Sequence, residues 1–255
     1  MPVQIIFVGP QRWRAQHVFN SNAYPPALRS VVDSCASRYA LLLLHTSTLH
    51  DALQRDIADF RRAIEGQRSD LEQAIKGRPE LQSVAVYDGL AHLAEMHSAL
   101  NSLKSFLDLY AKFMGKLVNS SNNWSFGKAI IDGQEVSGGR LVKALRSSSL
   151  NTLARLADIT LDHSQTWITD AVRYRDQLSH RSDLDNMQHM QLPLHNSPPH
   201  INFDELTRPV MPNGQDLGEY VDGLLRNLVA YVGASIEMLP NVDRALIAPG
   251  KMLAE

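Results

Sequence analysis

Apolar and small residues recur every three, four or seven positions along several long stretches of the chain. The first stretch covers residues 28–64, and later ones cover residues 86–117, 141–181 and 217–239. This spacing places the apolar residues on one face of a helix. The third stretch is interrupted at residues 147–149. The pattern predicts four or more long amphipathic helices, of which the first two pack against each other.

Three segments between these stretches lack the helical period. Residues 66–80 are typical of a short polar helix and turn, with Ser69 as its N-cap. Residues 119–140 contain Asp132-Gly133 between apolar residues, which favours a tight hairpin, with a short helix between loops as the alternative. Residues 186–216 contain five prolines and predict a long loop, with a short strand near residues 200–203.

Helical stretches outnumber strand signals, so the expected fold class is all-α, a bundle of four or more long helices with irregular insertions. Residues 1–27 are expected to form an N-terminal extension with a short strand over Val3–Val8. Residues 28–255 are expected to form a single helical domain that carries the irregular segments. A chain of 255 residues is long enough to bury a substantial core.

Composition narrows the function classes. A net charge of −2 argues against a surface coated with phosphate-binding groups, so any contact with nucleic acid must be local. The single cysteine, Cys35, excludes an intramolecular disulfide, and its helical spacing predicts a buried core position. The first apolar run ends at Gly9-Pro10, too early for a signal peptide, so a cytoplasmic protein without membrane spans is expected.

Most motifs of catalysis and metal binding are missing from the sequence. It has no glycine-rich phosphate loop, no G-x-S-x-G elbow and no dinucleotide fingerprint. His92 and His97 are five positions apart, whereas two zinc ligands on one helix face need a spacing of four. His97 falls on the apolar stripe and is expected to be a hydrogen-bonded core histidine. His189, His195 and His200 lie in the proline-rich segment without a supporting carboxylate spacing, so we expect no metal and no cofactor.

One short motif remains, in YRDQLSHRS at residues 174–182. Arg175 continues the apolar stripe of Ile168 and Ala171, and a guanidinium on such a face needs a carboxylate, a carbonyl or a phosphate. His180 follows Asp176 by four positions, so the carboxylate can bind one ring nitrogen and leave the other free. Arg175 and His180 point about 140° apart on an ideal helix. Either the helix ends between them, or two chains supply one residue each across a symmetry axis.

The residues RDQLSH, Arg175 to His180, on a late helix of a helical bundle resemble the R-x(4–6)-H signature of the HEPN superfamily. The resemblance covers these positions and the helical architecture. It implies a metal-independent endoribonuclease of toxin–antitoxin, phage-defence or RNA-processing systems. It also implies an RNA substrate, a homodimer whose active site forms where two motifs meet, and an antitoxin or regulatory partner.

The same resemblance implies roles for the three residues. His180 would act as general base or acid when an RNA 2′-hydroxyl attacks the adjacent phosphate. Arg175 would stabilise the charge that develops on the phosphorane oxygens, and Asp176 would orient His180. Cleavage would leave a 2′,3′-cyclic phosphate and would not occur on DNA, which lacks the 2′-hydroxyl.

Two other functions fit the residues. In a non-catalytic helical binding or scaffold protein, Arg175 and Asp176 would make structural ion pairs. In a phosphate- or nucleotide-binding bundle, Arg175 and His180 would hold a phosphate without cutting anything. Nearby basic residues would build an RNA groove in a ribonuclease and a solvated face in the other two cases. These residues are Arg140, Lys143, Arg146, Arg155, Arg173 and Arg181.

Overall fold

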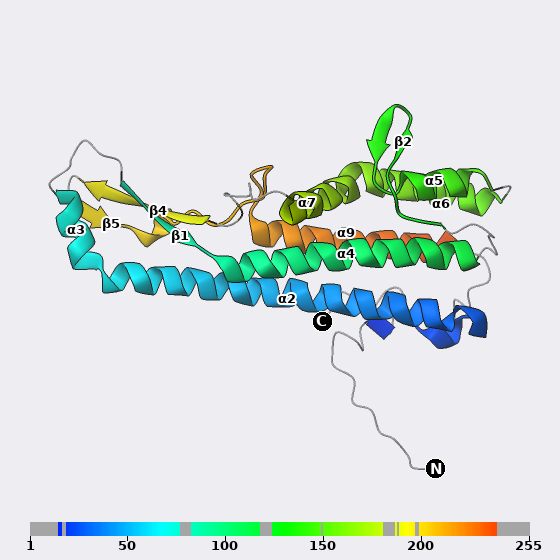
Figure 1. Cartoon of the computed structure of the whole chain (residues 1–255), viewed down its shortest axis with the longest axis horizontal. Helices are drawn as coiled ribbons and strands as arrows, with labels where there is room; N and C mark the ends of the chain where they lie inside the picture. The colour runs from blue at the N-terminus through cyan, green and yellow to red at the C-terminus, as the bar shows by residue number, and fades with distance from the viewer. Residues whose placement is uncertain are drawn as a thin grey trace, which may run out of the picture. The chain divides into compact units, whose positions relative to one another are not determined.

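A computed structural model describes residues 15–16, 19–76, 83–117, 124–148, 150–180, 187, 189–196 and 199–238. These residues are mostly helical, as predicted (Figure 1). The strand expected at Val3–Val8 lies outside the described residues. Among the helices that are described, none combines the length and the apolar character needed to cross a membrane.

The helices and strands have the following bounds. The longest helices are α2 (Arg29–Gly66), α4 (Leu90–Leu117) and α9 (Leu217–Met238). Shorter helices and turns are η1 (Ser21–Ala23), η2 (Pro26–Leu28), α3 (Arg68–Lys76), α5 (Gly139–Arg146), α6 (Asn151–His163), the π-helical turn η3 (Ser164–Ile168), α7 (Thr169–His180) and η4 (Phe203–Glu205). The strands are β1 (Ser83–Asp88), β2 (Ala129–Ile131), β3 (Gln134–Val136), β4 (His189–Asn196) and β5 (Pro199–Ile201).

The chain divides into two compact units. The first contains Met1–Leu44, Ser98–Asp176 and Leu224–Glu255, and the second contains His45–His97 and Gln177–Gly223. The single domain expected over residues 28–255 stays a prediction, since this division says nothing of whether either unit folds alone.

The core of the first unit is rich in aromatic rings. Phe106 of α4 lies with its ring centroid 5.6 Å from Phe19, 5.7 Å from Tyr39 of α2 and 5.5 Å from Tyr110. Contact between Tyr39 and Phe106 confirms that the first two predicted helices pack together. Cys35 is fully buried, as expected. Burial raises the pKa of its thiol to about 12, so the thiol stays protonated and unreactive at neutral pH.

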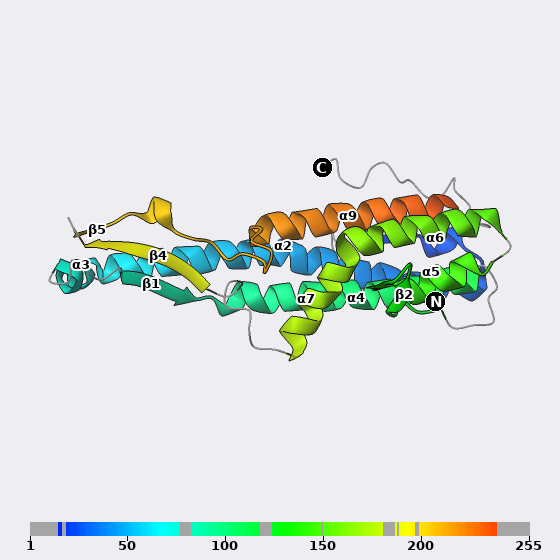
Figure 2. The same ribbon diagram turned by 90° about the horizontal axis from the view of Figure 1, so that it is seen from above.

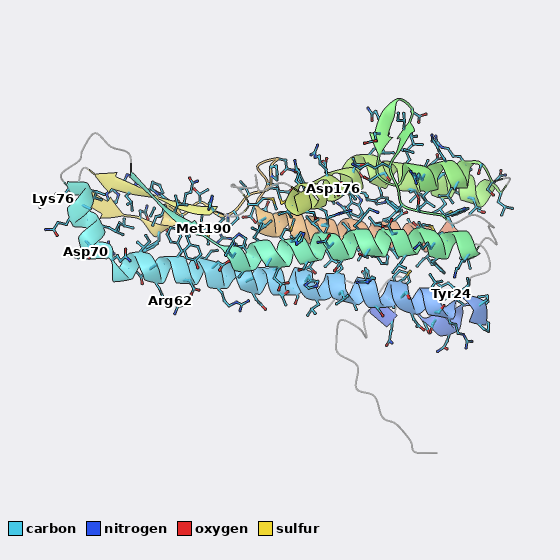
Figure 3. All side chains as sticks on the ribbon, in the orientation of Figure 1. Tyr24, Arg62, Asp70, Lys76, Asp176 and Met190 are labelled. Carbon is cyan, nitrogen blue, oxygen red and sulfur yellow. The ribbon has the colours of Figure 1, made fainter. Side chains whose placement is uncertain are left out.

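The core of the second unit lies between a helix and a sheet. Strands β1, β4 and β5 form an antiparallel sheet in the order β1-β4-β5. Figure 2 shows β1 and β4 side by side along the C-terminal part of α2. Met190, labelled in Figure 3, is one of the sheet residues that are buried in this core. The buried cluster consists of Leu53, Ile57, Phe60, Ile64, Ile75, Met190, Leu192, Leu194 and Ile201.

Several predicted elements are confirmed. Helix α2 begins at Arg29, and α9 covers the last stripe. The hairpin expected within residues 119–140 is confirmed, because β2 pairs with β3 around Asp132 and Gly133. These two residues have φ values of 51° and 84°, which is the geometry of a tight hairpin turn.

Three expectations are wrong. Residues 186–216 are not one long loop, because β4 pairs there with β1 and β5, with Pro193 in register with Val84; β5 agrees with the short strand expected near residue 200. The second stripe is not helical throughout, because Val86 belongs to β1 and its side chain is exposed. In both cases the strand partner lies about a hundred residues away in sequence, where local periodicity carries no signal. Ser69 lies inside α3 and does not cap it.

Candidate functional site

The predicted motif lies on one unbroken helix. Helix α7 includes Arg175, Asp176 and His180, so the helix does not end between the arginine and the histidine. A helix end between Arg175 and His180 therefore cannot bring the two residues together. The side chain of His180 lies outside the described residues, and its contact with Asp176 therefore stays a prediction.

Arg175 is partly buried and incompletely hydrogen-bonded. Its Nη1 lies 3.3 Å from Oδ1 of Asp176, and 24% of its side chain is exposed. Its Nε is buried, with no hydrogen-bond partner among the described residues. Such a group carries a desolvation cost that a further acceptor would relieve. The guanidinium thus has one donor that no described residue satisfies.

A second cation lies near the same carboxylate. Lys128 Nζ is 3.7 Å from Oδ2 of Asp176, which Figure 3 labels on α7. The side chains of Lys128 and Asp176 are 49% and 36% exposed, so solvent screens this pair and it contributes little to stability. Two positive groups around one carboxylate leave a net positive charge at this point of the first unit, which suits a phosphate.

A π-helical turn sets the rotation of α7. In η3 the N–H of Thr169 donates to the carbonyl of Ser164, five residues earlier. The Thr169 hydroxyl donates to the same carbonyl (2.6 Å) and accepts the N–H of Ser137 (3.1 Å). One extra residue in a helical turn rotates everything after it by about 100° relative to an unbroken α-helix. Thr169 therefore takes part in determining which face of α7 carries Arg175.

Gly138 lies beside this turn with a φ of +87°. A Cβ at this position would lie 2.6 Å from Cε1 of Phe126 and 3.0 Å from Oγ of Ser164. Gly133 has nearly the same φ, +84°, but nothing within 4 Å of its Cβ position. The two glycines separate the cost of the backbone conformation from the cost of the steric overlap.

We expect Gly138→Ala to lower the free energy of unfolding by about 2–3 kcal/mol, since it adds overpacking to a left-handed backbone. Gly133→Ala should cost only the backbone part, about 1 kcal/mol. Urea unfolding of both variants measures the difference. Equal losses would show that Phe126 and Ser164 yield freely to the added methyl group.

The predicted basic groove is partly neutralised. Arg173 pairs with Asp170 at 2.9 Å, and Arg146 lies 3.6 Å from Asp158. In contrast, Arg140, Lys143 and Arg155 are exposed on α5 and α6, and the described part of the chain shows no ion pair for them. Arg181 lies outside the described residues. Among the described residues, a basic surface for RNA would therefore rest mainly on Arg140, Lys143 and Arg155.

His163 is a titratable residue that the sequence analysis missed. The indole Nε1–H of Trp167 donates to its Nδ1 at 2.8 Å, so that nitrogen has no proton of its own. Burial lowers the pKa of His163. The histidine is therefore neutral at physiological pH, with its proton on Nε2. Its signal in the sequence was the spacing of four to Trp167 on a continuous helical stripe.

The core histidine of α4 is His92 and not His97. His92 is fully buried, whereas His97 is partly exposed and its Nε2 lies 3.3 Å from Oγ of Ser179. The expectation that His97 is a core residue is therefore wrong, although it does have a hydrogen-bond partner. The predicted stripe put His97 on the buried face of α4, whereas the buried face carries His92, Met96 and Ala99.

The histidines of the proline-rich segment separate into two groups. His189 lies 3.7 Å from Asp88, whereas His195 and His200 lie together with Glu205. The possible ligand atoms of these last three residues are all within 4.8 Å of one another. Sequence reasoning missed Glu205 as a carboxylate near these histidines, because its spacing of ten residues from His195 has no meaning before the strands are known.

We compared the chain with protein families, curated proteins and solved structures. No protein-family model, no curated protein and no solved structure matches this chain. The site is therefore interpreted from its own residues.

Proposed function

We propose that the protein is a metal-independent endoribonuclease of HEPN type, with Arg175 and His180 as its catalytic residues. The observation that supports this most is the buried Nε of Arg175, which has no partner in the described part of the chain. It lies on the helix that continues to His180. A guanidinium with an unsatisfied donor suits a phosphate that gains negative charge during the reaction, and a histidine can supply the proton transfer.

In the proposed reaction, His180 takes the proton of an RNA 2′-hydroxyl, and the resulting oxygen attacks the adjacent phosphorus. The bond from phosphorus to the 5′-oxygen breaks, and that oxygen takes a proton from the imidazolium of His180, which returns the histidine to its neutral form. The products are a 2′,3′-cyclic phosphate and a 5′-hydroxyl. Arg175 donates to the phosphorane oxygens, Asp176 orients the catalytic side chains, and Lys128 adds positive charge beside Asp176.

A homodimer is part of the proposal. Because α7 is continuous, positions 175 and 180 of one chain are about 140° apart around an ideal helix. A symmetric dimer can bring Arg175 of one copy to His180 of the other, and two equivalent sites then form. The exposed Arg140, Lys143 and Arg155 would contact the RNA backbone.

The proposal predicts that Arg175→Ala and His180→Ala each lower RNA cleavage at least about 100-fold, because each removes a group that acts in the transition state. Arg173→Ala is the matched control, an exposed arginine two residues away on the same helix that already pairs with Asp170. Purified full-length proteins are incubated with end-labelled RNA in the presence of EDTA. RNA with 2′-O-methyl groups should stay intact.

The dimer is tested by mixing the two inactive variants. If the sites are shared between chains, half of the chain pairs are mixed and each has one intact site, so about a quarter of the wild-type activity returns. A site within one chain gives no recovery. Cleavage that is equal in wild type and both variants, or that EDTA abolishes, would contradict the proposal. RNA binding that needs Arg175 without any cleavage would instead favour the phosphate-binding bundle.

A further inference from the structure

The second unit contains a pair of histidines that face each other across two strands. His195 of β4 is the direct partner of His200 of β5. Their rings are stacked, with centroids 4.3 Å apart and planes only 7° from parallel. Their strand neighbours Leu194 and Ile201 are also paired and are buried in the core. Since side chains alternate along a strand, the two histidines lie on the opposite, outer face of the sheet.

Glu205 completes this group from the turn η4. Its Oε2 lies 2.7 Å from Nε2 of His195. Its other oxygen, Oε1, accepts a hydrogen bond from Nδ2 of Asn202 (3.1 Å), and Oδ1 of Asn202 accepts the N–H of Asp204 (3.1 Å). Both ends of the Asn202 amide are therefore engaged. The amide holds the carboxylate so that Oε2 faces the histidines.

The donor set is that of a transition-metal site. Two imidazoles and one carboxylate are ligands that Zn²⁺ prefers, and three protein ligands leave a fourth position for water or another molecule. Neighbouring ligand atoms in a tetrahedral zinc site are about 3.3 Å apart, given Zn–N distances near 2.0–2.1 Å. His195 Nε2 and Glu205 Oε2 would separate by roughly half an ångström on binding. Rotation of partly exposed side chains is enough for that change.

The three side chains are partly exposed, but strand pairing and Asn202 restrict their positions. Carboxylates that bind a metal are themselves held by hydrogen bonds in protein sites, and Asn202 supplies such a bond to Glu205. We propose that His195, His200 and Glu205 bind a divalent transition-metal ion of the Zn²⁺ class, with one coordination position open. This site is independent of the proposed ribonuclease function.

The test titrates the full-length apoprotein with Zn²⁺ in a calorimeter, and with Co²⁺ as a spectroscopic probe of coordination. One ion should bind per chain. His195→Ala, His200→Ala and Glu205→Gln should each weaken binding at least about 100-fold, and Asn202→Ala should weaken it about 10–100-fold. His189→Ala is the matched control, since this histidine lies on the same strand beside Asp88 and outside the group. Its affinity should equal that of the wild type.

Thermal unfolding gives a second readout that does not depend on the calorimeter. Excess Zn²⁺ should raise the Tm of the wild type and of His189→Ala, but not that of His195→Ala. Circular dichroism confirms that the variants are folded. No binding by the wild type, or binding that the three ligand variants leave unchanged, overturns the metal site. EDTA-resistant RNA cleavage tests the other proposal separately, so the two can fail independently.

Discussion

Replacing His92 with alanine should lower the free energy of unfolding by about 3–5 kcal/mol, because it leaves the carboxyl group of Asp56 buried without its hydrogen-bond partner. His92 is fully buried, and its Nδ1 lies 2.7 Å from Oδ2 of Asp56. The same oxygen accepts the backbone N–H of His92 at 3.2 Å. This pair joins α2 to α4 within the second unit.

The hydrogen bonds show how the proton is held. Nε2 of His92 lies 2.9 Å from the carbonyl oxygen of Met187, which can only accept, so Nε2 carries a proton and donates it. Nδ1 lies 2.7 Å from Oδ2 of Asp56, which is hydrogen-bond distance. Both ring nitrogens are therefore satisfied, which explains how a histidine can be fully buried here.

An exposed pair of the same chemistry provides the control. Nε2 of His50 lies 3.0 Å from Oδ1 of Asp222, with side chains 43% and 55% exposed. His50→Ala should cost less than about 1 kcal/mol, since solvent screens this pair. Urea unfolding of both variants measures the contrast. A similar small loss for His92→Ala would mean that water reaches Asp56 once the ring is removed.

Replacing Phe106 with alanine should cost a similar amount, about 3–5 kcal/mol, through the cavity that it leaves. The Phe106 side chain is fully buried and packs against the rings of Phe19, Tyr39 and Tyr110. These neighbours come from separate elements and cannot all move into the space. The loss should appear as a lower midpoint in urea with an unchanged slope.

Leu41→Ala is the matched control in the same unit, because this side chain is 37% exposed and its removal opens no closed cavity. It should cost less than about 1 kcal/mol. If Phe106→Ala costs no more than Leu41→Ala, the aromatic cluster is not closely packed in solution, and the core of the first unit must lie elsewhere.

Local pattern was sufficient for the elements whose contacts are local. Helices α2 and α9, the hairpin at Asp132-Gly133 and the buried Cys35 were all predictable, because helical spacing and turn conformation depend on neighbouring residues. The candidate motif from Arg175 to His180 was also visible, as residue types at a fixed spacing. The helical stripe extended to about residue 181, but the sequence also allowed the helix to end between Arg175 and His180, and the structure decided for an unbroken helix.

The tertiary structure decided what depends on residues far apart in sequence. Strand β4 needs β1, about a hundred residues earlier, and only this pairing converts the proline-rich segment into a sheet. The π-helical turn before α7 and the burial of His92 instead of His97 also follow from packing between elements. Glu205 joins His195 and His200 only once β4 and β5 are paired. Periodicity along a chain records the geometry of one element, whereas a site is made by several elements whose relative placement no single stretch encodes.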